Sequence, residues 1–213
     1  MITLKVDPND PDMKSIRAAA EAIRNGELVV FPTETVYGLA ADAFNEQAIK
    51  AVYSAKGRRD NQPLPVQVGS IQDVSKVAQF ISPDAKRLAE IYWPGPLTLI
   101  LTKSAALPSL VTSGGKTVGV RISDHPIALA LVKAVGSPIV ATSANVSGAS
   151  SPKTAAEAIS DVGENVSVVL DGGSSRYGVA STVVDMTVMP PKILRRGSLS
   201  VDDIRKVLGE VEE

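Results

Sequence analysis

The sequence contains no cysteine and a single histidine in 213 residues. Without cysteine the chain cannot form disulfides, use a thiol nucleophile or bind zinc through thiolates. A lone histidine excludes sites built from several histidines and leaves only a triad that uses this one. His125 lies next to Pro126 at an expected helix start, where we predict a structural role. Proton transfer would then use lysine, substrate groups or a carboxylate, for which Glu34 and Asp42 are candidates by position.

The sequence also lacks an excess of charge and any long apolar run. Its formal net charge is −1, which argues against nucleic-acid binding over the whole surface but allows a local basic pocket. No apolar stretch reaches membrane length, and the N-terminus has no signal-peptide pattern. We therefore expect a cytoplasmic protein with no membrane partner, and a single domain over residues 1–213.

Hydrophobic periodicity predicts roughly eight strands that alternate with six or seven helices. Several strands follow one another without a helix between them, which favours an α/β fold with a mixed sheet. One expected strand begins at Leu28. The others cover residues 65–68, 97–102, 118–122, 139–141, 166–170, 181–185 and 193–195. The expected helices cover residues 12–25, 46–55, 71–80, 84–92, 126–135 and 154–159, with a last helix capped by Ser200.

The segment Leu28–Ala40 begins as a buried strand that Pro32 stops. Three polar residues, Thr33–Thr35, then stand where the strand should end. Ligands often bind at strand ends of α/β sheets, so these side chains are candidates for a site. A turn capped by hydroxyl groups explains them equally well.

Four cations suggest a pocket for a polyanion. Arg121 and Arg195 lie inside segments that otherwise read as strands, and Lys56 and Arg58 lie in a polar loop. A charged side chain in a covered sheet is costly without an anionic partner, although either arginine could be a solvated residue of an edge strand. Lysine offers a point charge and arginine a fork that matches carboxylate or phosphate.

A phosphate-binding loop of the P-loop type is not expected at Ser113–Thr117. The motif needs a glycine where this chain has Leu110. The segment also leads into a strand, whereas a P-loop leads into a helix.

Several ordered blocks together resemble the YrdC family of threonylcarbamoyl-AMP synthases. They are Phe31–Leu39, Lys56–Arg58, Pro63–Leu64, Trp93–Thr98, Val120–Arg121, Ser143–Asn145 and Ser181–Asp185. The resemblance covers nearly the whole chain. It implies an open twisted mixed sheet flanked by helices, with a large concave, positively charged cavity. Longer members carry an extra C-terminal domain, so a chain that ends at Glu213 resembles the short, single-domain type.

The resemblance also implies a reaction and its participants. ATP, L-threonine and bicarbonate would form threonylcarbamoyl-AMP and pyrophosphate, with Mg²⁺ held by phosphate oxygens and water rather than by a protein metal site. The product would pass to downstream threonylcarbamoyl transferase machinery for the t6A modification of tRNA. Either tRNA or double-stranded RNA is a further expected partner.

Roles for individual residues follow from the resemblance alone. The threonine-binding set would be Thr33, Gln67, Arg121, Ala141 through its backbone, and Ser181, with Arg121 on the carboxylate. The ATP-binding set would be Lys56, Arg58, Asp60, Thr117, Ser143, Asn145, Ser151 and Arg195. Lys56 and Arg58 would be catalytic, because they offset charge on the phosphates.

Three positions depart from the family pattern. Arg59 replaces a proline, Gln67 a histidine, and Ala180 a glutamate or proline. Gln67 can still hydrogen-bond a hydroxyl but cannot become charged.

Two alternative functions remain open. One is an RNA-binding module of the same fold without this activity, and the other is a different carbamoyl or adenylyl transferase.

Overall fold

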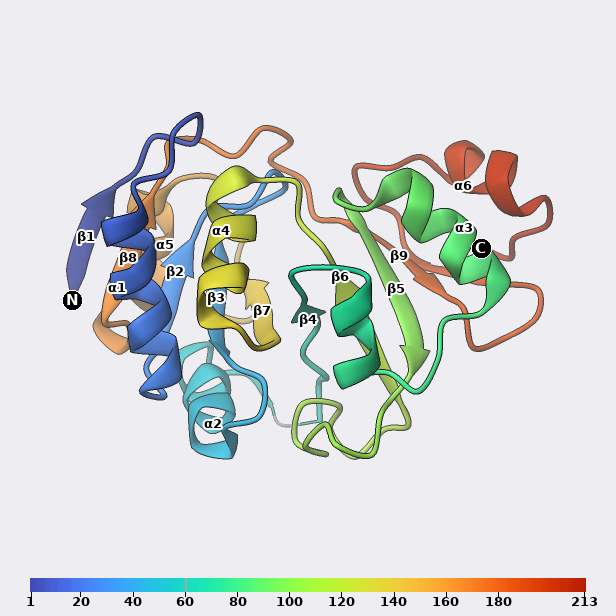
Figure 1. Cartoon of the computed structure of the whole chain (residues 1–213), viewed down its shortest axis with the longest axis horizontal. Helices are drawn as coiled ribbons and strands as arrows, with labels where there is room; N and C mark the ends of the chain where they lie inside the picture. Colours follow the sequence, from blue (N-terminus) through green and yellow to red (C-terminus); the bar gives the residue numbers. More distant parts are fainter. Residues whose placement is uncertain (60) are drawn as a thin grey trace.

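Ten strands form one mixed sheet in the computed structural model, which describes residues 1–59 and 61–213. In spatial order they run β1-β8-β2-β3-β7-β4-β6-β5-β9-β10 (Figure 1). Their bounds are β1 Ile2–Lys5, β2 Val29–Phe31, β3 Gly38–Asp42, β4 Val66–Gln67, β5 Leu97–Thr102, β6 Thr117–Arg121, β7 Ile139–Ser143, β8 Val168–Asp171, β9 Thr182–Asp185 and β10 Lys192–Arg195. Parallel and antiparallel pairs both occur, which confirms the predicted mixed sheet.

Helices flank this sheet on both faces. Their bounds are α1 Met13–Arg24, α2 Glu46–Ala55, α3 Pro83–Tyr92, α4 Pro126–Val135, α5 Ala155–Val162 and α6 Val201–Leu208, with 3₁₀ turns η1 Gln72–Lys76 and η2 Gly163–Asn165. Most begin at a residue whose side chain accepts from the first turn; the carboxylate of Asp12, for example, accepts from the amide of Lys14 at 3.1 Å. No helix in the described ranges is both long and apolar enough to cross a membrane.

The structure corrects three sequence predictions. Strands β1 and β3 were missed, because β1 is a short, mostly exposed edge strand and β3 is rich in alanine, a residue that is depleted in strands. β3 owes its conformation to its neighbours, β2 and β7. The helix expected over residues 71–80 was wrong. Only η1 forms there, and Gln79 instead donates its backbone N–H to Thr102 at the end of β5, at 2.9 Å.

The two faces of the sheet are covered unequally. On one face, inward residues of β4, β5 and β6 join a large core with α2, α3, α5 and α6; they include Val66, Leu97, Leu99, Val118 and Val120. On the other face, Val29, Phe31, Ala40 and Ile139 pack under α1 and α4. Figure 1 shows these two helices side by side over the left-hand half of the sheet. The same face is therefore free of α1 and α4 farther along, toward β5 and β9.

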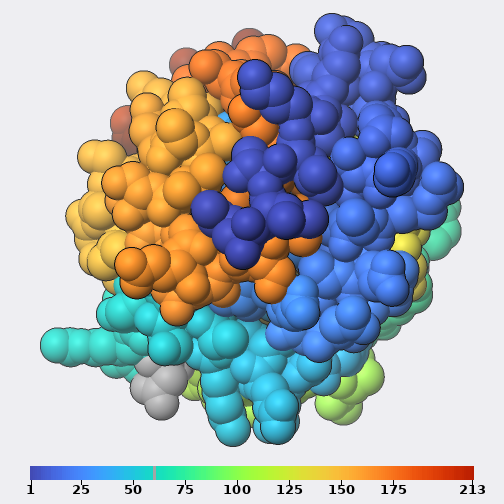
Figure 2. Space-filling view, turned by 90° about the vertical axis from the view of Figure 1, so that its left-hand side faces the viewer, coloured from blue at the N-terminus to red at the C-terminus, as the bar shows by residue number. Residues whose placement is uncertain are grey.

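The N-terminal strand, β1, forms one edge of the sheet. β1 pairs in parallel with β8, with Ile2 opposite Val168 and Leu4 opposite Leu170. Figure 2, which views this end, shows the dark blue N-terminal segment lying across the orange segment that contains β8. A sheet edge is thus present here, far in strand order from β5, β6 and β9.

A substitution at Gly197 tests how tightly the C-terminal segment is packed. A Cβ at Gly197 would overlap the backbone of Ala180–Thr182, the segment that enters β9. We expect Gly197→Ala to lower the free energy of unfolding by about 1–3 kcal/mol, because that backbone must shift. Urea denaturation measures the change.

Gly69→Ala is the matched control, because its Cβ would meet side-chain atoms no closer than 3.5 Å. We expect its unfolding free energy to stay within about 0.5 kcal/mol of the wild type. Equal stability of the two variants would contradict the packing described for Gly197.

Candidate active site

A cavity of about 290 Å³ occupies the half of the sheet face that α1 and α4 leave free. Neighbouring side chains of a strand point to opposite faces, so alternate residues of each strand reach it. The pattern is clear in β5, where Thr98 and Ile100 line the cavity while Leu97 and Leu99 enter the core. Its volume is close to the lower end of the range for small-molecule sites, about 300–1,000 Å³.

The polar lining of the cavity is cationic and hydroxylated. Arg58, Arg121 and Arg195 line it, and the described lining residues include no aspartate or glutamate. Hydroxyl groups stand between the arginines; they belong to Thr33, Thr35, Thr98, Thr142, Ser143, Ser151 and Ser181. Guanidinium groups with interspersed hydroxyl donors suit a ligand that carries carboxylate or phosphate groups.

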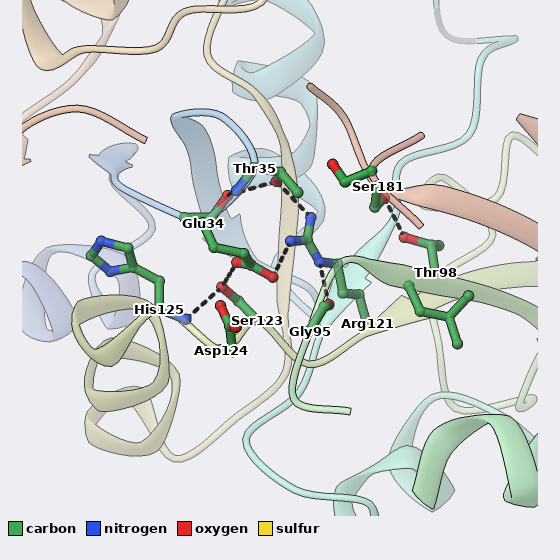
Figure 3. A network of polar contacts seen from close by, with 12 residues as sticks. Glu34, Thr35, Gly95, Thr98, Arg121, Ser123, Asp124, His125 and Ser181 are labelled. Carbon is green, nitrogen blue, oxygen red and sulfur yellow. Dashed lines mark hydrogen bonds and ion pairs between the residues drawn. The ribbon is translucent and has the colours of Figure 1, made fainter. Parts of the chain in front are cut away.

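Arg121 is buried at the end of β6 and held on three sides (Figure 3). Its Nε donates to the carbonyl of Gly95 at 3.2 Å. One terminal nitrogen donates to the hydroxyl of Thr35 at 2.9 Å, and the other to a carboxylate oxygen of Glu34 at 2.6 Å. These contacts fix the plane of the guanidinium group at the cavity wall.

Glu34 supplies the negative charge that allows Arg121 to be buried. The residue is only 1% exposed, and its second carboxylate oxygen accepts from the hydroxyl of Ser123. Burial alone would raise the pKa of the Glu34 carboxyl, but the charge of Arg121 and the bonds from Ser123 and Arg121 outweigh it and lower the pKa. Glu34 is therefore ionised at neutral pH.

The turn after β2 is capped by the hydroxyl group of Thr33, and the same residues also line the cavity. The Thr33 hydroxyl donates to the carbonyl of Val36 at 2.6 Å. Its proton is thereby used, so in the 2.8 Å contact between the hydroxyls of Thr33 and Thr35 it is Thr35 that donates. The Thr35 oxygen remains an acceptor for Arg121. The two interpretations of Thr33–Thr35 are thus compatible.

Arg195 reaches the same cavity from β10. Its Nε donates to the carbonyl of Ser181 and a terminal nitrogen to the Ser181 hydroxyl, both at 3.0 Å. That hydroxyl also lies 2.8 Å from the hydroxyl of Thr98. Burial and the neighbouring charge of Arg121 lower the pKa of Arg195, as expected for two cations that share one cavity.

Arg58 lies across the cavity, after α2. One of its terminal nitrogens donates to the carbonyl of Pro63 at 2.9 Å, and the other to the hydroxyl of Thr142 at 3.3 Å. Its Nε is buried and has no hydrogen-bond partner among the described residues. A buried donor without a protein partner calls for an acceptor from a ligand or from water.

Lys56 lies beneath the cavity wall rather than in it. The side chain is fully buried, and its ammonium group donates to the carbonyls of Ser143 and Asn145, the latter at 2.5 Å. The side-chain oxygen of Asn145 lies 3.4 Å away. Burial, with a smaller contribution from the charge of Arg58, lowers the pKa of Lys56 to about 8. Lys56 thus anchors the loop that follows β7.

Comparison with known proteins shows the family to which the chain belongs. The Sua5/YciO/YrdC family model, described as "Telomere recombination", matches residues 21–197. The chain belongs to the Sua5/YciO/YrdC family. A solved structure of this family, Pyrococcus abyssi Sua5 complexed with L-threonine, superposes with a TM-score of 0.97 at 44% identity and covers 100% of this chain and 62% of that one.

Two curated members of the family are named threonylcarbamoyl-AMP synthase. The Pyrococcus abyssi protein is 46% identical over 196 residues, which is 92% of this chain and 58% of that protein. The Bacillus subtilis protein is 42% identical over 211 residues, which is 99% of this chain and 60% of that protein. The chain therefore spans about three fifths of the length of these relatives.

The structure brings most of the predicted site residues to one cavity. Those that line it are Thr33, Arg58, Gln67, Arg121, Ala141, Ser143, Ser151, Ser181 and Arg195. Lys56 and Asn145 lie behind the wall, where they hold the loop after β7. Thr117 begins β6 and is not among the lining residues, and Asp60 lies outside the described residues.

Sequence reasoning missed Thr98 and the partners of Arg121. Thr98 could have been found from the alternation in Leu97–Thr102, which places every second residue on the face opposite the core. The ion pair with Glu34 joins segments 87 positions apart, and nothing in the local pattern reveals it. Neither Glu34 nor Asp42 lines the cavity, so neither places a carboxylate there as a general base.

The lowered pKa of Lys56 predicts a dependence of stability on pH. Between pH 8 and the ordinary lysine pKa, near 10.5, the folded chain has lost a proton that the unfolded chain keeps, so stability rises with pH in this window. The difference in unfolding free energy between wild type and Lys56→Met should rise by up to about 1.4 kcal/mol per pH unit there. Urea denaturation at pH 7.5, 8.5 and 9.5 measures it. A difference that stays flat or falls would contradict the environment described for Lys56.

Proposed function

We propose that the protein is an L-threonylcarbamoyladenylate synthase. It would condense L-threonine, bicarbonate and ATP into threonylcarbamoyl-AMP and release pyrophosphate. The observation that carries the proposal is the convergence of Arg58, Arg121 and Arg195, with hydroxyl groups between them, in a single cavity. The names of the curated relatives, and the threonine complex of the Pyrococcus abyssi structure, support it.

L-threonine would bind where Arg121 and Ser181 meet. A guanidinium group has five N–H donors, and protein acceptors engage three of those of Arg121. The remaining donors can receive the amino-acid carboxylate. Gln67, Thr33 and the backbone of Ala141 would complete this subsite.

ATP would bind beside this subsite, with its phosphates on Arg58 and Arg195. Ser143 and Ser151 also line the cavity and offer hydroxyl donors. Lys56 and Asn145 would act through the loop after β7, whose carbonyls receive the Lys56 ammonium group. We keep Asp60 and Thr117 as further predicted contacts of the nucleotide.

The reaction would proceed in two steps. The deprotonated amine of threonine attacks CO₂ and loses a proton, or attacks bicarbonate and releases water, to give N-carboxythreonine. Its new carboxylate attacks the α-phosphorus of ATP, the bond to the β-phosphate oxygen breaks, and pyrophosphate leaves. Arg58 and Arg195 offset the charge that develops on the phosphates, so the chain would act mainly by positioning and charge neutralisation.

Several further features complete the proposal. The described residues contain no group of three histidine or acidic side chains that could hold a metal, so Mg²⁺ would arrive on the phosphate oxygens. The product would pass to threonylcarbamoyl transferase machinery that modifies tRNA. One sheet with helices on both faces supports a single domain over residues 1–213.

Exchange of labelled pyrophosphate into ATP tests the proposal. We expect exchange only when both L-threonine and bicarbonate are present. Arg58→Ala should lower its rate on the order of 10²-fold, because a preorganised donor to the phosphates is lost. Arg59→Ala is the matched control, since Arg59 is exposed and does not line the cavity; its rate should change less than about threefold.

Two results would count against the proposal. Exchange without threonine, or equal rates for Arg58→Ala and wild type, would remove this cavity from the reaction. Salt-sensitive RNA binding by a chain that shows no exchange would favour the alternative of an RNA-binding module.

A further inference from the structure

Two neighbouring arginines in the cavity differ in how their charge is compensated. Arg121 contacts Thr35 and Arg195 contacts Ser181, and both arginines line the cavity. Burial and the charge of Arg121 lower the pKa of Arg195, so the two guanidinium groups repel each other. Arg121 forms an ion pair with Glu34 at 2.6 Å. Arg195 donates only to the carbonyl and hydroxyl oxygens of Ser181 among the described residues, and these oxygens carry no formal charge.

This difference suits two kinds of anion. A paired guanidinium group keeps its directional N–H donors but has little net charge, so it favours a monovalent carboxylate of the right shape. An uncompensated guanidinium group attracts the multiply charged phosphates most strongly, because Coulomb energy grows with the charge of the ligand. Both groups are guanidinium forks with free N–H donors, so the compensation of their charge determines which anion each one prefers.

We propose that Glu34 is a specificity-determining residue that keeps phosphate groups out of the amino-acid subsite. By neutralising Arg121, it reserves that guanidinium group for the carboxylate of the amino acid and leaves the phosphates to Arg195. This inference rests on the proposed function, because it assumes that both ligands use this cavity.

The surroundings of Glu34 hold it in this role. Its carboxylate is engaged on both oxygens, by Arg121 and by Ser123, and its backbone carbonyl accepts from the amide of Tyr177 at 2.8 Å. The side chain is not itself among the lining residues, so it acts through Arg121 and does not compete for the ligand. Its lowered pKa keeps it charged at neutral pH.

The sheet offers a reciprocal position beside Arg195. Val183 of β9 is the cross-strand neighbour of Arg195 and also lines the cavity. Residues opposite each other in an antiparallel pair lie on the same face, within reach of each other's side chains. A glutamate at this position would give Arg195 the carboxylate that only Arg121 has in the wild type.

Calorimetric titration of the full chain with L-threonine, with and without inorganic pyrophosphate, tests the inference. In the wild type we expect pyrophosphate to leave the threonine Kd unchanged. In Glu34→Gln, pyrophosphate should raise the apparent threonine Kd at least about tenfold, because Arg121 becomes an uncompensated cation. Glu34→Asp should behave like the wild type. An unchanged threonine Kd in Glu34→Gln would overturn the inference, and so would loss of threonine binding in the folded variant without pyrophosphate.

If Glu34→Gln does not fold, Val183→Glu tests whether a neighbouring carboxylate controls phosphate binding by an arginine. Val183→Glu should weaken pyrophosphate binding at least about tenfold relative to Val183→Gln, which has the same size without the charge, while both bind threonine equally. Equal pyrophosphate affinities would overturn the inference. If the wild type fails to bind L-threonine at all, the proposed function itself fails. If the wild type binds threonine but the substitutions change neither the effect of pyrophosphate on the threonine Kd nor the pyrophosphate affinity, the inference alone fails.

Discussion

The buried ion pair between Glu34 and Arg121 is the constraint on which the site depends. It joins the turn after β2 to the end of β6, on opposite sides of β3, β7 and β4 in the sheet. A buried charge without its partner is strongly destabilising, typically by about 3–5 kcal/mol, so each residue requires the other. The pair therefore holds the turn of Thr33 and the guanidinium group of Arg121 in a fixed relation, and with them one wall of the cavity.

The cavity itself is a consequence of partial coverage of the sheet. Strands with period-two alternation have two faces, and each face must be buried or must be polar. α1 and α4 cover one half of the second face, and the other half carries Thr98, Gly119, Arg121 and Ser181. The cavity exists because of this asymmetry, since helices over the whole face would leave no room for it.

Much of this could be predicted from the sequence, and the failures have physical causes. Caps such as Asp12 and the alternation in Leu97–Thr102 are local signals, and the elements that depend on them were found. β3 was missed because its strand conformation comes from pairing, not from propensity. The cations in strand-like segments and in the polar loop predicted a shared pocket, and Arg58, Arg121 and Arg195 do line one cavity. The loop-anchoring position of Lys56 depends on contacts 87 and 89 residues away along the chain.

The most direct measurement is a structure of the protein with L-threonine and a non-hydrolysable ATP analogue. The account predicts the threonine carboxylate at hydrogen-bond distance, about 3 Å, from the guanidinium group of Arg121, and phosphate oxygens at the same distance from Arg58 and Arg195. It also predicts that Lys56 keeps its contacts with the carbonyls of Ser143 and Asn145. Phosphates on Arg121, or either ligand bound outside this cavity, would contradict it.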